Sequence, residues 1–196
     1  VSADKMVALD RYIVQKAQAY QAEIVKAYED FQFHVVYQKI NHFCAIDLGG
    51  FYLDIIKDRQ YTLATNSLAR RSCQTAMYHI LQALTRWLAP ILSFTAEEIW
   101  SHMPHQQQTS VFLESWYQQW PSIQGLDIES FDKLQLLRDD INKALELQRQ
   151  HGKIGSALEA NVILYVDADV MSWLAPMASE LKFFFICSGC ELRDMH

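Results

Sequence analysis

Residues 57–61 read KDRQY, a short run that places two cations and an aromatic ring close together. Lys57 and Gln60 offer hydrogen-bond donors that can reach the edges of a nucleic-acid base. Arg59 and Tyr61 offer the flat surfaces on which unstacked RNA bases pack. The alternative is an ordinary solvated helix end, because cations also interact favourably with the C-terminal end of a helix. The residue types leave both interpretations open.

A second pair of cations, Arg70 and Arg71, falls in the first turns of the next expected helix. Cations are unfavourable at a helix N-terminus, so their presence there needs a reason. A bound phosphate supplies one, since the free N–H groups of the first turn and two guanidinium groups can converge on it. Internal pairing with Glu97 or Glu98 is the alternative, and the sequence does not decide between them.

Other groups of potentially reactive side chains are less informative. Cys187 and Cys190 have the spacing of a zinc pair, but a structural zinc site needs four ligands. His102 and His105 flank a proline without a nearby third ligand. The chain has no glycine-rich phosphate loop and no nucleophile motif. We therefore expect no catalytic residue, metal site or cofactor within this chain.

Charge and composition exclude several classes of protein. Half of the 196 residues are hydrophobic and the net charge is −6, which disfavours indiscriminate binding to nucleic acid, including DNA. Residues 57–86 nevertheless hold five cations against one acid. No apolar run is long enough for a bilayer, no signal peptide is evident, and four scattered cysteines suggest a reducing cytoplasm. The start at Val1 suggests a piece of a longer protein.

Amphipathic helices must position these residues, since apolar side chains recur every three or four positions. They are expected from Met6 to Glu29, from Phe33 to near Arg59, from Asn66 or Ser67 to Pro90, and from about Asp127 to Gly152. Gly49-Gly50 interrupts the second helix, where we expect a kink or a close crossing because the apolar register resumes beyond it.

The remaining segments are shorter. Residues 95–98 read as a capping box that opens a helix to Met103. Residues 104–126 are expected to be a connector whose apolar side chains pack back on the helices, namely Val111, Phe112, Trp116 and Trp120. Residues 160–168 and 182–187 read as strands on either side of a helix that Asp167 caps.

The predicted fold is mainly α, an antiparallel helical bundle followed by a small α/β piece. The bundle is expected to span residues 1–122, a connecting amphipathic helix residues 123–152, and the start of an α/β domain residues 153–196.

Three stretches carry a resemblance to a known family: FYLDIIKDRQYT, RRSCQTAMYHILQALTRWLAPILSFTAEEIW and GKIGSALEANVILY. They resemble the C-terminal region of bacterial-type isoleucyl-tRNA synthetases. The resemblance implies a class Ia anticodon-binding bundle followed by the start of a C-terminal junction domain. It implies tRNA as the partner and a cytoplasmic parent enzyme that joins isoleucine to its tRNA for protein synthesis. The family's HIGH-type and KMSKS-type motifs are missing, so ATP, magnesium, zinc and catalysis are expected to belong to other parts of the parent, its catalytic domain included.

The same resemblance assigns tRNA-binding residues by position. Lys57 matches a lysine associated with anticodon discrimination, and Arg59 continues that motif towards Tyr61. The double arginine at 70 and 71 matches the family's next helix, and Lys153 lies where it can meet the anticodon loop or stem. Gly49-Gly50 replaces the bulkier residues expected there.

We therefore expect the four cations near the helix ends to lie on one solvent-facing surface: Lys57, Arg59, Arg70 and Arg71. Two rivals remain. Valyl-, leucyl- and methionyl-tRNA synthetases share this bundle, so the chain could belong to one of them. A helical protein-interaction module without RNA binding would instead hold Lys57 and Arg71 in internal ion pairs.

Overall fold

A computed structural model of the chain describes residues 1–104, 108–125 and 128–195. The chain divides into two compact units, Val1–Leu126 and Asp127–His196. Within the part of the chain that the structure describes, no helix combines the length and the apolar composition needed to cross a membrane.

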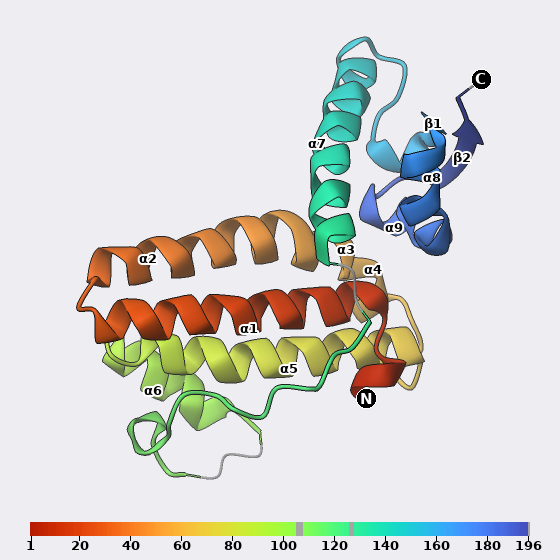
Figure 1. The fold of residues 1–196 in the computed structure, drawn as a ribbon. Helices are drawn as coiled ribbons and strands as arrows, with labels where there is room; N and C mark the ends of the chain where they lie inside the picture. The colour runs from red at the N-terminus through yellow and green to blue at the C-terminus, as the bar shows by residue number, and fades with distance from the viewer. Residues whose placement is uncertain (105–107, 126–127, 196) are drawn as a thin grey trace. The chain divides into compact units, whose positions relative to one another are not determined.

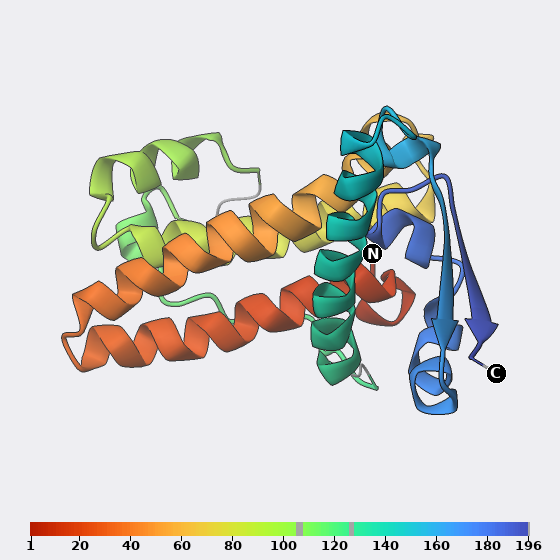
Figure 2. The same cartoon turned by 90° about the horizontal axis from the view of Figure 1, so that it is seen from above.

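The first unit is built on long helices that lie side by side (Figure 1). The helix α1 packs against both α2 and α5, and its inward face is apolar because Leu9, Ile13 and Ala17 recur at helical spacing. In Figures 1 and 2, α2 runs antiparallel to α1, whereas α5 runs in the same direction as α1. The bounds are Ala8–Glu29 for α1, Phe33–His42 for α2, Leu68–Leu88 for α5 and Ser93–His102 for α6.

The helical path continues past Gly49-Gly50 as a wider π-helix. A Cβ atom at Gly49 would lie 3.2 Å from the carbonyl oxygen of Cys44, and one at Gly50 would lie 3.3 Å from that of Ala45. These oxygens belong to residues five positions earlier, so the two glycines permit the tight contact that the π-turns create. The helix continues past the glycines as expected, but their close contacts are with carbonyls of the same helix and not with a crossing helix. The π-helix spans Phe43–Tyr52, followed by α3, Leu53–Ile55, and α4, Lys57–Tyr61.

A buried carboxylate in the π-helix ties it to α1. Asp47 is 1% exposed. Its Oδ1 atom lies 2.8 Å from Nζ of Lys16, and its Oδ2 atom accepts a hydrogen bond of 2.8 Å from the Tyr20 hydroxyl. A buried charge is tolerated when it is paired and hydrogen-bonded, so Asp47 constrains how the π-helix and α1 pack.

The predicted cap of α5 is confirmed and that of α6 is wrong. Ser67 precedes α5, and its side chain accepts a hydrogen bond from the Arg70 N–H. The helix α6 begins at Ser93, two residues before the expected cap, so Thr95 lies inside it. The Glu97 carboxylate instead accepts hydrogen bonds from Ser110 and from the backbone of Val111. A glutamate that looked like part of a capping box therefore holds the connector.

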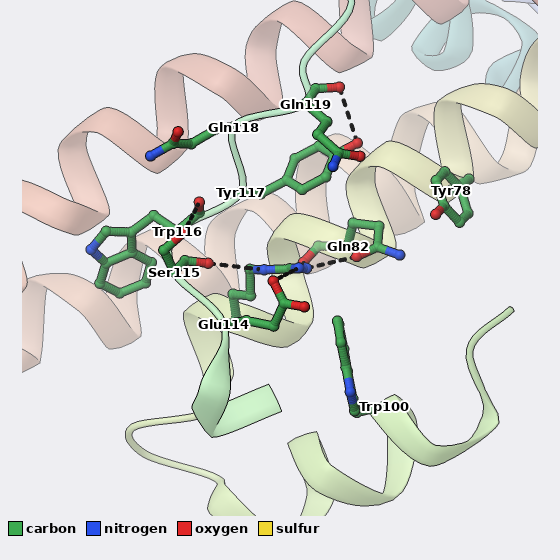
Figure 3. Close-up of a pocket in the computed structure, with 10 residues that line it drawn as sticks. Tyr78, Gln82, Trp100, Glu114, Ser115, Trp116, Tyr117, Gln118 and Gln119 are labelled. Carbon is green, nitrogen blue, oxygen red and sulfur yellow. Dashed lines mark hydrogen bonds and ion pairs between the residues drawn. The ribbon is translucent and has the colours of Figure 1, made fainter. Parts of the chain in front are cut away.

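Arg86 anchors the connector to α5. Its guanidinium donates to the Glu114 carboxylate at 2.9 Å, to the Ser115 carbonyl at 3.0 Å, and to the backbone and side chain of Gln82. It also lies 4.8 Å from the centre of the Trp100 ring. Figure 3 shows the contacts of the Ser115 carbonyl and the Glu114 carboxylate as dashed lines. Arg86, Glu114 and Ser115 all line a cavity of about 230 Å³.

Part of the predicted connector packing is confirmed. Val111 is buried, and Trp116 stacks on Tyr28 of α1 with ring centres 5.6 Å apart. Trp120 meets the edge of Tyr117, a residue of the connector itself, so this contact does not test its packing on the helices. The prediction is wrong for Phe112, which is 56% exposed. Phe112 lies in the single 3₁₀ turn Val111–Leu113. Neighbouring side chains in so tight a turn point in different directions, so Val111 and Phe112 cannot both face inward.

The second unit begins with α7 and continues into two parallel strands. The helix predicted as a connector at 123–152 lies in this unit from residue 127 onward, and its expected start at Asp127 falls outside the described residues. The strands pair in register from Asn161 with Gly189 to Val166 with Asp194. The bounds are Ile128–Gln150 for α7, Asn161–Val166 for β1, Ala168–Leu174 for α8, Leu181–Phe184 for α9 and Gly189–Asp194 for β2.

The first predicted strand is confirmed, and Asp167 caps α8 by accepting a hydrogen bond from the Val170 N–H. The helix is confirmed in its first part only, because α8 ends at Leu174 instead of running on to Leu181. The second predicted strand, at 182–187, is wrong because α9 occupies that run and β2 follows it. Leu181, Phe184 and Phe185 are all buried, at helical spacing. The fold class is confirmed as mainly α with a small α/β piece.

Replacing Arg86 with methionine is expected to lower the free energy of unfolding by about 3–5 kcal/mol, because Glu114 would remain partly buried without its cation. Urea unfolding followed by circular dichroism measures this change. Lys143→Met is a matched control, since Lys143 pairs with Asp140 on an exposed helix face and its loss should change stability little. Equal effects of the two substitutions would contradict the anchoring role of Arg86.

Candidate nucleic-acid interface

A fully buried carboxylate, Asp10, organises the end of the bundle where α1 and α5 begin. Its Oδ1 atom accepts a 2.8 Å hydrogen bond from the Tyr52 hydroxyl, and its Oδ2 atom accepts one of 2.5 Å from Ser72. A guanidinium nitrogen of Arg59 lies 3.7 Å from Oδ1. Burial and the Asp10 charge raise the pKa of Tyr52 well above its usual range, so this hydroxyl stays protonated and donates.

The ion pair with Asp10 corrects the prediction for Arg59. Arg59 is 4% exposed, so it does not share a solvent-facing surface with the other cations and cannot stack on a base. The physical reason is that a buried carboxylate needs a nearby cation, and α4 supplies one from its inward side. In the sequence, Asp10 looks like an ordinary acid in the first turn of a helix, so nothing there signalled that Arg59 would turn inward.

Lys57 and Tyr61 form the exposed face of α4. They stand four residues apart and so lie on one side of the helix. Tyr61 is 85% exposed. Nζ of Lys57 lies 2.7 Å from Oδ1 of Asp54, and this hydrogen bond raises the pKa of Lys57, which keeps its charge at neutral pH. An ammonium donor and an open aromatic ring are thus presented side by side.

The two adjacent arginines of α5 have different roles. The Arg70 guanidinium donates a 2.8 Å hydrogen bond to the Leu63 carbonyl and so braces the loop between α4 and α5. The Arg71 side chain is exposed, and within the described residues no hydrogen bond or ion pair joins it to another side chain. Pairing of either arginine with Glu97 or Glu98, the alternative interpretation, is absent from the described part of the chain.

The exposed groups lie at one end of the first unit. The helices α4 and α5 contact each other, and Figures 1 and 2 place α4 beside the first turns of α5. Lys57, Tyr61 and Arg71 are therefore presented from the same end of the bundle. The prediction of a shared cationic surface is wrong for Arg59, while Arg70 is half-buried and engaged with the loop.

Lys153 belongs to the second unit and is exposed just beyond the end of α7. Its backbone N–H donates to the Gln148 carbonyl, and Gly152 before it has a φ of +70°, which closes the helix as expected.

Potential metal ligands do not gather within residues 1–104, 108–125 and 128–195, where no three His, Cys, Asp or Glu side chains form a group. Cys187 and Cys190 are free thiols, and burial raises the pKa of Cys190 to about 11. A raised pKa disfavours the thiolate that a metal requires. Of the predicted histidine pair, His105 lies outside the described residues.

Comparisons with known proteins show which family the chain resembles as a whole. The family described as the anticodon-binding domain of tRNA ligase matches residues 10–164. An isoleucine–tRNA ligase of Legionella pneumophila (strain Corby) is 54% identical over 97% of this chain and 20% of its own length. One of Klebsiella pneumoniae (strain 342) is 48% identical over 99% of this chain and 21% of its own. The chain spans about a fifth of the length of the curated relatives it matches.

Arg59→Ala is expected to destabilise the fold by about 3–5 kcal/mol, because it removes the cation beside the buried Asp10 carboxylate. Arg71→Ala removes the same charge from an exposed site and should leave the unfolding midpoint nearly unchanged. Thermal and urea unfolding of both variants measure the difference. A stable Arg59→Ala protein would show that Asp10 does not depend on this ion pair.

Proposed function

Because the chain belongs to the family of anticodon-binding domains of tRNA ligases, we propose that it recognises the anticodon region of an isoleucine tRNA as part of an isoleucine–tRNA ligase. The parent protein would join isoleucine to its tRNA at the expense of ATP, in the cytoplasm. The catalytic domain, with ATP and magnesium, and a zinc-binding module would lie in the parent outside residues 1–196.

The observation that carries this proposal is the pair of exposed groups on α4. Lys57 and Tyr61 stand on one side of a short helix whose inward residue, Arg59, is held at the buried Asp10 carboxylate. An unstacked anticodon base would pack on the Tyr61 ring, while the Lys57 ammonium would exchange Asp54 for an acceptor on a base edge. Rigid attachment of α4 limits the conformational entropy lost on binding.

Arg71 supports the complementary part of the proposal, the contact with the RNA backbone. It is exposed, and its guanidinium is a bidentate donor suited to phosphate. Phosphate contacts position a nucleic acid and base contacts select it. The acidic excess of the remainder of the chain would disfavour other orientations of the polyanion. Arg70 and Lys153 remain predicted contacts.

The rival functions are less well supported. Relatives about half identical over nearly the whole chain carry the isoleucine name, which favours isoleucine over valine, leucine or methionine. The protein-interaction alternative required Lys57 and Arg71 to be tied up internally. Within the described residues Arg71 has no ion pair, and the one partner of Lys57 there is Asp54, an exchangeable contact on the same turn.

Lys57→Ala is expected to reduce discrimination between a cognate isoleucine anticodon stem-loop and one with a changed anticodon by about tenfold, the value of one base-reading contact. Fluorescence anisotropy with the 196-residue chain measures both affinities. Lys26→Ala is the matched control, because Lys26 is an exposed lysine paired with Asp30 at the other end of α1. Unchanged discrimination in Lys57→Ala would contradict the assignment.

Arg71→Ala should weaken binding to cognate and changed stem-loops by the same factor, because a phosphate contact carries no sequence information. The slope of log affinity against log salt should fall by about one for the lost contact. A titration at several salt concentrations measures it. Loss of discrimination with an unchanged salt slope would instead make Arg71 a base-reading residue.

A further inference from the structure

A second arginine lies on the same side of the helix pair as Arg71. The Asp10 carboxylate of α1 accepts a hydrogen bond from Ser72 of α5, so these two residues face each other. Arg11 is one residue after Asp10, and Arg71 is one residue before Ser72. The helices α1 and α5 run in the same direction (Figure 1). Moving one residue forward along α1 and one residue back along α5 rotates each side chain by about 100° around its helix axis. The two rotations bring both side chains to the same side of the helix pair.

The side of the α1/α5 pair that carries Arg11 and Arg71 faces away from the π-helix. Tyr20, which holds Asp47 of the π-helix, stands nine residues after Arg11 and therefore about half a turn around the α1 axis from it. Arg11 is thus directed away from the π-helix. Thr75 lies one turn after Arg71 on α5 and so faces the same side. Its hydroxyl accepts a hydrogen bond from the amino group of Val1, which brings the N-terminal segment to this side. Lys5 of that segment is exposed.

Arg11 is half-buried and has no partner among the residues that the structure describes. Its Nε atom is buried and makes no hydrogen bond, and no ion pair joins its guanidinium to another described residue. The neighbouring Asp10 carboxylate does not serve it, since Tyr52, Ser72 and Arg59 occupy that group. A partly desolvated cation without a partner is unfavourable unless something neutralises it. Asp4, an exposed acid nearby in sequence, forms no ion pair with Arg11 among the described residues, and the Ser2 side chain lowers the pKa of Asp4.

We propose that Arg11 and Arg71 together hold one phosphate of the tRNA backbone, a role that rests on the proposed function. Axes of packed helices lie about 8–10 Å apart, so two long arginine side chains on one side of the pair can reach the same phosphate. Each guanidinium donates two parallel hydrogen bonds to phosphate oxygens. Arg11 positions the RNA backbone, while Lys57 and Tyr61 on α4 read the bases.

The test is binding of the 196-residue chain to the isoleucine anticodon stem-loop and to a loop with a changed anticodon. Arg11→Ala is expected to weaken both about tenfold and to lower the salt slope by about one. Combined with Arg71→Ala, it should cost less than the product of the two single effects, because both side chains act on one phosphate. Lys26→Ala, the matched lysine on α1, should change affinity and slope little.

Methylphosphonate substitution identifies the phosphate itself. Among stem-loops that are each neutralised at one backbone phosphate, one should bind the wild-type chain more weakly than the unmodified loop does. The same modified loop should bind Arg11→Ala about as well as the unmodified loop does. Arg11→Lys keeps the charge without the bidentate geometry, so it should retain the salt slope and lose part of the affinity. Circular dichroism confirms that each variant is folded, and Arg11→Lys replaces Arg11→Ala in the comparison if the alanine variant unfolds.

The outcomes separate this inference from the proposed function. A wild-type chain that binds the cognate loop, with Arg11 variants of unchanged affinity and salt slope, overturns the phosphate role and leaves anticodon recognition intact. Additive losses in the double variant overturn the shared phosphate. A wild-type chain that binds neither loop overturns both.

Discussion

The first unit depends on satisfying a carboxylate that has no access to water. Asp10 accepts hydrogen bonds from Tyr52 and Ser72 and lies beside the Arg59 guanidinium. These partners come from the π-helix, α5 and α4, so one buried charge determines how the segments meet α1. A charge in this position is tolerated only while its partners stay in place. The exposed groups at this end of the bundle are therefore carried by elements that cannot shift independently.

Similar constraints act along the rest of the bundle. Asp47 fastens the π-helix to α1, and Arg86 fastens the connector to α5 through Glu114 and the Ser115 carbonyl. In each place a polar group inside an apolar surrounding selects one packing arrangement, while burial of apolar side chains supplies most of the favourable free energy. The polar contacts therefore fix how the elements pack, whereas the burial of apolar side chains supplies most of their stability.

Sequence patterns predicted the long elements and failed where tertiary contacts decide. The periodic apolar runs located α1, α5 and α7, and Ser67 and Asp167 were recognised as caps. A short apolar run such as 182–187 fits a strand or a buried helix equally well, which is why α9 was missed. The inward turn of Arg59 depends on the burial of Asp10, a residue far away in sequence, and Thr95 was misread because Glu97 binds the connector.

The helix α4 directs its side chains into two separate environments, the interior of the bundle and the solvent. Arg59 faces the interior, whereas the side chains of Lys57 and Tyr61 are largely exposed to solvent. Substitutions at these two outer positions can therefore accumulate without unfolding the protein. Under the proposed function, exchanging these two surface residues would change which anticodon the bundle prefers without disturbing the residues that maintain its architecture.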